Sequence, residues 1–288
     1  MNILPQLILN SVIAGAIYTL VALGFNLSFG AARFFNLAHG TVAVAGGYVV
    51  LFLMKWLQVD PVLSVISGVV SAGFIGYGLF QLVYAPLREH KASNLVLLVA
   101  SLGAFIALQA ILAMLFSSQF QTLYQGSLVP TTYAILGGVI TQVQLLTLGS
   151  AFLITLGLAL VLNMTVFGKA VRAVSDDEEV AKIVGINTRK IIGRVFFMAS
   201  AIAGLGGILI GFDTGLEPTT GLPLLLKGVI ASIIGGIGNV YGGVLGAFLL
   251  GFVENFGIWK ISGEWKDAIA FTLLIIFLIF RPNGIIRR

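Results

Sequence analysis

The chain has 288 residues, of which 58% are hydrophobic and 9% are charged. A soluble protein carries roughly 25% charged residues, so this composition excludes a water-soluble domain and indicates a protein solvated by lipid. The absence of cysteine excludes disulfides, thiolate metal sites and cysteine nucleophiles. The net charge of +5 comes from single basic residues between apolar runs, so nucleic acid is not an expected partner.

Nine apolar runs follow one another along the chain, and most approach the length of about 20 residues that a membrane-crossing helix needs. They cover residues 7–29, 41–57, 61–84, 94–116, 145–164, 191–212, 222–237, 240–259 and 265–280. Helix is expected for each run, because an unpaired N–H or C=O group in lipid costs several kcal/mol. The sequence therefore predicts an all-α, polytopic integral membrane bundle formed by one domain over residues 1–288.

The glycine-rich stretch 222–259 makes the number of helices hard to fix. As one helix it would be about 57 Å long, which is more than one crossing uses and less than two crossings need. Short or broken helices that line a cavity would resolve this, so we expect eight to ten transmembrane helices.

Basic residues give the orientation, because cytoplasmic loops of membrane proteins carry an excess of Lys and Arg. If Arg33, the loop 88–91, the segment 169–194 and the C-terminal tail are cytoplasmic, twelve of the sixteen basic residues lie inside. This predicts a cytoplasmic C-terminus. The first apolar run has no basic residue before it and no evident cleavage site after it, so we interpret it as a retained helix.

Small residues recur at helical spacing in two of the later runs. Gly207 and Gly211 are four residues apart, and Gly238, Gly242 and Gly246 continue the same spacing. Such faces let helix backbones approach closely in a membrane. Packing within the chain is the main interpretation, and a subunit interface is the alternative.

One extended polar segment interrupts the apolar runs, at about residues 168–190. Ser175 followed by Glu178 is typical of a capping box, and acidic side chains suit the first turn of a helix. Gly185 is placed to end the helix in a left-handed conformation. We therefore expect a helix over 176–184 outside the membrane, with the acidic first turn made by Asp176, Asp177, Glu178 and Glu179.

The expected helix has an apolar side formed by Val180, Ile183 and Val184. A helix this short is not stable alone in water, so something must cover that side. Two interpretations stay open: the side packs on the chain's own helix ends or on lipid, or it docks into a groove of a cytoplasmic partner and transmits motion.

Few polar residues lie within the apolar runs. Asn36, His39 and Glu254 are the candidates for a polar pathway. A structural histidine is the more ordinary interpretation of His39, and a position near the interface or a local pairing is as ordinary for Glu254. No phosphate-binding Gly-x-x-x-x-Gly-Lys-Ser/Thr motif occurs, so any use of ATP requires a partner. Two distant histidines do not make a metal site.

Four blocks of sequence resemble the H-type permease of bacterial branched-chain amino-acid ABC importers. They are Phe35-Asn-Leu-Ala-His-Gly40, the segment 175–187, the glycine-rich block 235–247 and Arg281-Pro-Asn-Gly-Ile285. The resemblance implies a permease in the bacterial inner membrane that pairs with a sister permease and receives substrate from a periplasmic binding protein. It also implies two cytoplasmic ATPase subunits that hold ATP and Mg²⁺, with no cofactor on this chain.

The resemblance further implies that one segment couples the permease to the ATPases, through Ser175, Asp176, Asp177, Glu178, Glu179, Val180, Ile183, Val184, Gly185, Ile186 and Asn187. The implied activity is inward transport of leucine, isoleucine and valine by alternating access. The candidates for the translocation pathway are Asn36, His39, Gly40 and Glu254. An importer of urea or another small amide, and a stand-alone secondary transporter, are the alternatives.

Overall fold

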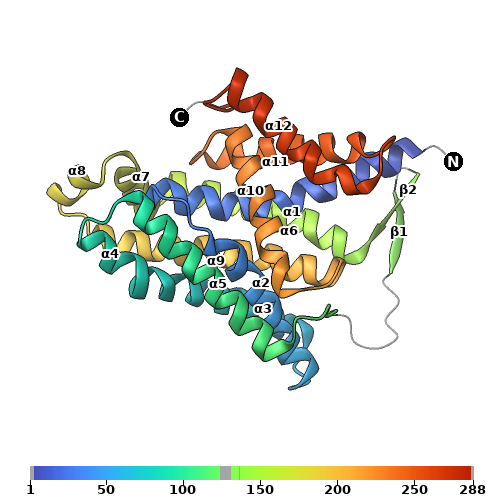
Figure 1. Ribbon diagram of the computed structural model, residues 1–288, viewed down its shortest axis with the longest axis horizontal. Helices are drawn as coiled ribbons and strands as arrows, with labels where there is room; N and C mark the ends of the chain where they lie inside the picture. Colours follow the sequence, from blue (N-terminus) through green and yellow to red (C-terminus); the bar gives the residue numbers. More distant parts are fainter. Residues whose placement is uncertain (1–2, 124–130, 136, 287–288) are drawn as a thin grey trace.

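The computed structural model describes residues 3–123, 131–135 and 137–286, and it consists mainly of long helices that run along one axis (Figure 1). The helices in chain order are α1 (Ile3–Ala32), α2 (Ala38–Lys55), α3 (Pro61–Leu79), the π-helical turn η1 (Phe80–Tyr84), α4 (Ala85–Glu89), α5 (Asn94–Phe116), α6 (Gln142–Met164), α7 (Val166–Asp176), α8 (Glu178–Ile183), α9 (Thr188–Asp213), the short helix η2 (Pro218–Thr220), α10 (Gly221–Gly235), α11 (Val240–Gly257), the short helix η3 (Gly263–Trp265) and α12 (Lys266–Phe280).

The helices agree with the apolar runs of the sequence. Among the described residues, eight helical segments are long and apolar enough to cross a membrane, with α3 to α4 forming one segment and η2 with α10 forming another. α12 also covers a predicted run, but its 15 residues span only about 22 Å. The prediction of a polytopic helical membrane protein is confirmed.

The bundle is organised around α1 and α2. α1 contacts α9, α10 and α11, and α2 contacts α3, α5, α9 and α10. In contrast, α3, α5, α6 and α12 expose large apolar side chains, for example Phe74, Leu102, Phe152 and Phe280. A soluble protein does not expose apolar surface on this scale, so these outer helices face a nonpolar environment.

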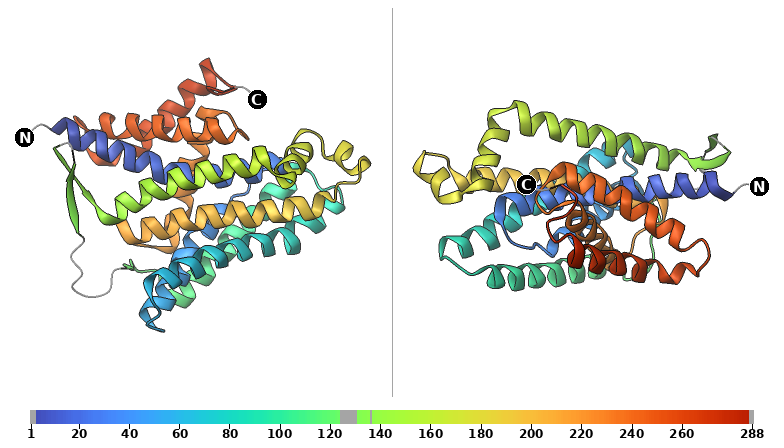
Figure 2. Two further views of the ribbon diagram at one scale, coloured as in Figure 1. Left: turned by 180° about the vertical axis from the view of Figure 1, so that it is seen from behind. Right: turned by 90° about the horizontal axis from the view of Figure 1, so that it is seen from above.

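The two ends of the bundle are distinct (Figure 2). At one end, called here the α8 end, lie α4, α7 and α8. At the other end, called the hairpin end, the N-terminal part of α1 lies beside two short antiparallel strands, β1 (Thr132–Ile135) and β2 (Gly138–Thr141). Gln6 holds β2 there, because its side chain accepts from the N–H of Val139 at 2.8 Å and donates to its carbonyl at 3.1 Å.

The hairpin is a departure from a purely helical chain. It lies in the polar, charge-free insertion that follows α5, which the sequence does not mark as either helix or strand. Tyr133 pairs with Ile140 and Ala134 with Val139, so the two strands satisfy the backbone groups on their shared edge. Arg287 and Arg288, which the sequence assigns to a basic tail, lie outside the described residues.

Glycines bring helix backbones together inside the bundle. Gly246 in α11 lies against the carbonyl oxygen of Ala231 in α10, and Gly242 lies against Gly235. Gly207 in α9 meets the backbone of Ala43 in the same way. A Cβ at any of these positions would overlap backbone atoms, so only glycine permits the contacts.

Two of the predicted packing glycines differ from these. Gly211 lies against the side chains of Leu123 and Leu216 rather than against a backbone. Gly238 is not on a helix face, which corrects the expectation: it lies between α10 and α11 with a φ of +79°. The chain turns sharply there, and Gly236 has a φ of +113° for the same reason. The four-residue spacing of Gly238 with Gly242 is therefore not a helical one.

The close contact of α10 with α11 gives a prediction. Gly246→Ala places a methyl group on the Ala231 carbonyl, so it is expected to destabilise the fold by about 1–3 kcal/mol and to lower the Tm of the detergent-solubilised protein. Gly149→Ala in α6 is the matched control, because a Cβ there meets no atom within 4 Å. An equal Tm for both variants would contradict the contact.

Candidate functional site

The polar segment of the sequence forms two helices at the α8 end rather than one. Asp176 is the last residue of α7, and Asp177 has an extended backbone between α7 and α8. Its carboxylate accepts from the N–H groups of Glu179 at 2.9 Å and Val180 at 3.0 Å. Asp177 is therefore the N-cap of α8, a role that suits a short acceptor side chain.

The predicted capping box of Ser175 with Glu178 is wrong. Ser175 is buried inside α7, and its hydroxyl donates to the carbonyl of Gly30 in α1 at 2.5 Å. The reason is that residues 166–176 are themselves an amphipathic helix that packs on α1 and α6, so the chain turns two residues later than expected. Glu178 is consequently free to pair with residues of other helices.

The end of α8 agrees with the sequence. Gly185 has a φ of +87°, and its N–H donates to the carbonyl of Lys182 at 3.0 Å. The N–H of Ile186 donates to the carbonyl of Ala181 at 3.0 Å, so the two bonds complete a Schellman motif. Asn187 then caps α9 by accepting from the N–H of Lys190 at 2.9 Å. Both ends of α8 are thus fixed by hydrogen bonds.

α8 turns its apolar side away from the protein. Val180, Ile183 and Val184 are 53%, 83% and 68% exposed, whereas Ala181 is buried. In the chain by itself, therefore, this side does not pack on the other helix ends, which was one of the two interpretations of the sequence. An exposed apolar cluster on a charged helix is a feature of contact surfaces.

Salt bridges and hydrogen bonds tie α8 to the rest of the bundle. The Arg88 guanidinium at the end of α4 pairs with Glu178 and also donates to the carbonyl of Ala32 at 2.5 Å. Lys182 lies 3.3 Å from Glu178, and its hydrogen bond with Glu179 raises the pKa of Lys182. One arginine thus connects α8, α4 and the end of α1.

A second arginine strengthens this connection. Arg33 follows α1 with a φ of +60°, an unusual conformation for a residue with a side chain, and its guanidinium donates to the carbonyl of Ser175. The Arg88 contacts, the Arg33 contact and the Ser175 hydroxyl bond are called here the α8 tether. A groove of about 420 Å³ lies beside the tether, lined by residues of α4, α8 and α9 that include Arg88, Glu178 and Ile192.

The candidate pathway residues near α2 lie inside the chain. Asn36 accepts a hydrogen bond from the Tyr84 hydroxyl at 2.9 Å. His39 is buried beside Gly24 of α1 and the backbone of Ala199 in α9, and Gly40 lies against Gly221 at the start of α10. His39 and Gly40 thus lie where α2 meets α1, α9 and α10, whereas Asn36 contacts η1.

Glu254 lies elsewhere, in a buried charged cluster between α1, α10, α11 and α12. Its carboxylate is 0% exposed; it pairs with Lys227 at 2.5 Å and accepts from the Tyr18 hydroxyl at 2.6 Å. Lys227 also pairs with Asp267 at 2.7 Å, and Lys266 lies 3.8 Å from Glu254. A local pairing of Glu254 was one interpretation of the sequence, but Lys227 was not identified as the partner. A lone Lys and a lone Glu inside neighbouring apolar helices are the signal for it.

The fold and the α8 surface define the class: a multi-pass helical membrane protein with a short, tethered helix whose apolar side is exposed. The family described as "Branched-chain amino acid transport system / permease component" matches residues 7–278, and the chain belongs to this family. Among the described residues, no group of three or more His, Asp or Glu side chains is placed to hold a metal ion.

Similar proteins match along almost the whole chain. The high-affinity branched-chain amino acid transport system permease protein BraD of Pseudomonas aeruginosa is 32% identical, over 98% of this chain and 95% of its own length. LivH, the permease protein of the same description from Escherichia coli K12, is 30% identical with the same coverage. The autoinducer 2 import system permease protein LsrC of Yersinia enterocolitica is 32% identical, but over only 44% of this chain.

The buried charged cluster gives the prediction for this region. Lys227→Met leaves buried Glu254 with the Tyr18 hydrogen bond and with Lys266, 3.8 Å away, as its one remaining cation among the described residues, whereas Glu254→Gln leaves Lys227 paired with Asp267. Removing one partner of a buried pair costs about 3–5 kcal/mol, so we expect Lys227→Met to lower the Tm more than Glu254→Gln. In the double variant the Tm is expected to fall by less than the sum of the decreases in the two single variants. Additive decreases in thermal unfolding would argue against the pairing.

Proposed function

We propose that the chain is the membrane-spanning permease subunit of an ATP-driven importer of branched-chain amino acids. The observation that carries the proposal is the match to BraD and LivH over 98% of the chain, together with the tethered α8 surface. The resemblance to H-type permeases implies the composition of the complete importer. It contains this chain, a sister permease, two cytoplasmic ATPases that bind ATP and Mg²⁺, and a periplasmic binding protein.

The distribution of charge supports an orientation with the α8 end in the cytoplasm. Arg33, Arg88 and Arg189 gather there through their contacts with Ser175, Glu178 and Glu89. Because cytoplasmic ends carry the excess of basic residues, this charge distribution supports a cytoplasmic C-terminus. We propose the bacterial inner membrane as the location, since the resemblance implies it.

The coupling role belongs to α8 and its flanking turns. The exposed Val180, Ile183 and Val184 offer an apolar contact to an ATPase subunit. The charged side chains of α8 on either side of this contact fix how α8 aligns on the ATPase surface. Since both ends of α8 are capped and Glu178 is held by Arg88, a force on α8 acts directly on α1 and α4. This is the physical link that alternating access requires between nucleotide binding and the permease helices.

The roles of Asn36, His39, Gly40 and Glu254 in translocation remain proposals. All four are enclosed in this conformation. A substrate would reach His39 and Gly40 only after α2 or α10 moved, because Gly40 and Gly221 hold these helices in contact. Glu254 is also neutralised by Lys227, which makes a role in anchoring α10 to α11 the simpler one for it.

The proposal is tested by reconstituting the chain with its sister permease, ATPases and binding protein in proteoliposomes and measuring uptake of radiolabelled leucine. We expect uptake that requires both ATP and the binding protein. Leucine flux through this chain alone, driven by a gradient, would favour a secondary transporter instead. If urea rather than leucine is taken up, the chain is still an importer permease, but its substrate is not a branched-chain amino acid.

One substitution addresses coupling in the same assay. Ile183→Asp puts a charge at the centre of the α8 surface and is expected to weaken ATPase association by about tenfold or more and to abolish uptake. Ile261→Asp is the matched control, because Ile261 is 52% exposed in the loop between α11 and α12. Similar ATPase retention by the two variants in a pull-down would contradict the docking role of α8.

A further inference from the structure

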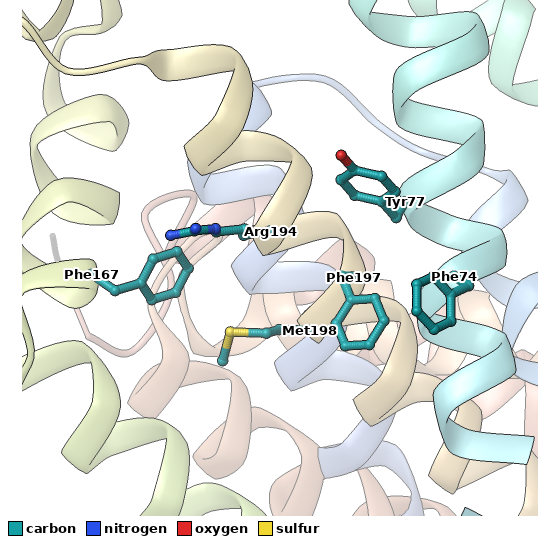
Figure 3. A pocket seen from close by; sticks show the side chains of 6 residues that line it. All are labelled: Phe74, Tyr77, Phe167, Arg194, Phe197 and Met198. Carbon is teal, nitrogen blue, oxygen red and sulfur yellow. The ribbon is translucent and has the colours of Figure 1, made fainter. Parts of the chain in front are cut away.

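A groove of about 380 Å³ lies on the side of the bundle, between α3, α7 and α9. Phe74 and Tyr77 of α3 form one wall and Phe167 of α7 forms the other, with residues of α9 between them (Figure 3). The α9 residues are Arg194, Phe197 and Met198. The groove is therefore lined by apolar and aromatic side chains and by a single charged one.

The depth of the groove in the membrane follows from its neighbours. Phe167 is the second residue of α7, directly after the apolar helix α6 ends at Met164. α7 buries Val171 and Val174 and exposes Lys169, as a helix at the boundary of a bilayer does. Arg194 beside Phe167 consequently lies near the headgroups at the α8 end, while Phe74 extends the groove toward the bilayer interior.

No described carboxylate neutralises the charge of Arg194. Arg88 and Arg189 at the same end pair with Glu178 and Glu89, respectively. Within the described part of the chain, Arg194 has neither a carboxylate nor a hydrogen-bond partner, and it is exposed to the groove. An unpaired guanidinium at this depth is suited to a phosphate group, to which it can donate two parallel hydrogen bonds.

We propose that this groove binds an anionic phospholipid, with the phosphate on Arg194 and an acyl chain along Phe74 and Phe197. We choose an anionic lipid because its charge is complementary to the groove, which has a cation at the level of the headgroups and only apolar contacts below it. Phe74 is 62% exposed and Tyr77 is 38% exposed, so the aromatic wall is open to a chain from the surrounding bilayer. The site does not depend on which substrate the permease carries.

A lipid in this position connects three parts of the protein. It would contact α3, which continues into Arg88 of the α8 tether, as well as α7 and α9, which flank α8. Its binding therefore stabilises the arrangement in which the tether is formed. Anionic lipid is accordingly expected to raise the thermal stability of the chain more than zwitterionic lipid does.

The test compares lipid binding by the purified, detergent-solubilised chain with Arg194→Ala, Arg194→Lys and the control Lys260→Ala. Lys260 is also an exposed cation beside an aromatic ring, that of Trp259, but it lies between α11 and α12. Native mass spectrometry counts retained phosphatidylglycerol and phosphatidylcholine, and thermal unfolding with each lipid measures the stabilisation.

We expect the wild type to bind phosphatidylglycerol about fivefold more tightly than phosphatidylcholine, because one cation near the membrane surface contributes an attraction of that size. Arg194→Ala should abolish the preference, Arg194→Lys should retain part of it, and Lys260→Ala should leave it unchanged. An unchanged preference in Arg194→Ala overturns the proposal. The proposal is also overturned if the complete, reconstituted importer retains no lipid because another subunit covers the groove. Size-exclusion chromatography of each variant checks that a change in lipid binding is not due to misfolding.

Discussion

The structure depends on the contact between one arginine and two elements that are far apart in the chain. Arg88 pairs with Glu178 of α8 and donates to the carbonyl of Ala32 at the end of α1. That carbonyl belongs to the last turn of a helix, where it has no partner along the chain and carries negative partial charge. The same guanidinium thus satisfies the end of a transmembrane helix and fixes the helix that is offered to a partner.

The interior explains why motion at α8 would reach the membrane core. α1 runs from the tether to the hairpin end, and on its way it contacts α9, α10 and α11. Glycines hold these helices at backbone distance, and the Glu254–Lys227 pair joins α11 to α10. In a bilayer, dispersion and buried pairs of this kind replace the hydrophobic driving force between helices. A displacement of α1 is therefore passed on by close packing rather than absorbed.

Much of the architecture could be predicted from the sequence, because the surrounding lipid restricts which backbone conformations are stable. Apolar runs without charges must be helical in lipid, and all nine predicted runs coincide with helices. The end of α8 was also predictable, since Gly185 has a conformation that glycine adopts readily.

The site was less predictable because its contacts join distant residues. Asp177 rather than Ser175 caps α8, since packing of Ser175 against Gly30 extends α7 by two residues. Local spacing does not carry that information. The same holds for the pairing of Glu178 with Arg88 and for the exposure of Ile183, which follow from how α4 and α8 meet.

The most direct test of the account exchanges the charges of the tether in the reconstituted importer. Arg88→Glu and Glu178→Arg are each expected to reduce the leucine transported per ATP hydrolysed, because α8 is no longer held to α4. The double exchange is expected to restore part of the ratio, with the remaining loss due to the Ala32 contact that Arg88 also makes. A wild-type ratio in both single variants would show that the tether does not couple α8 to the membrane helices.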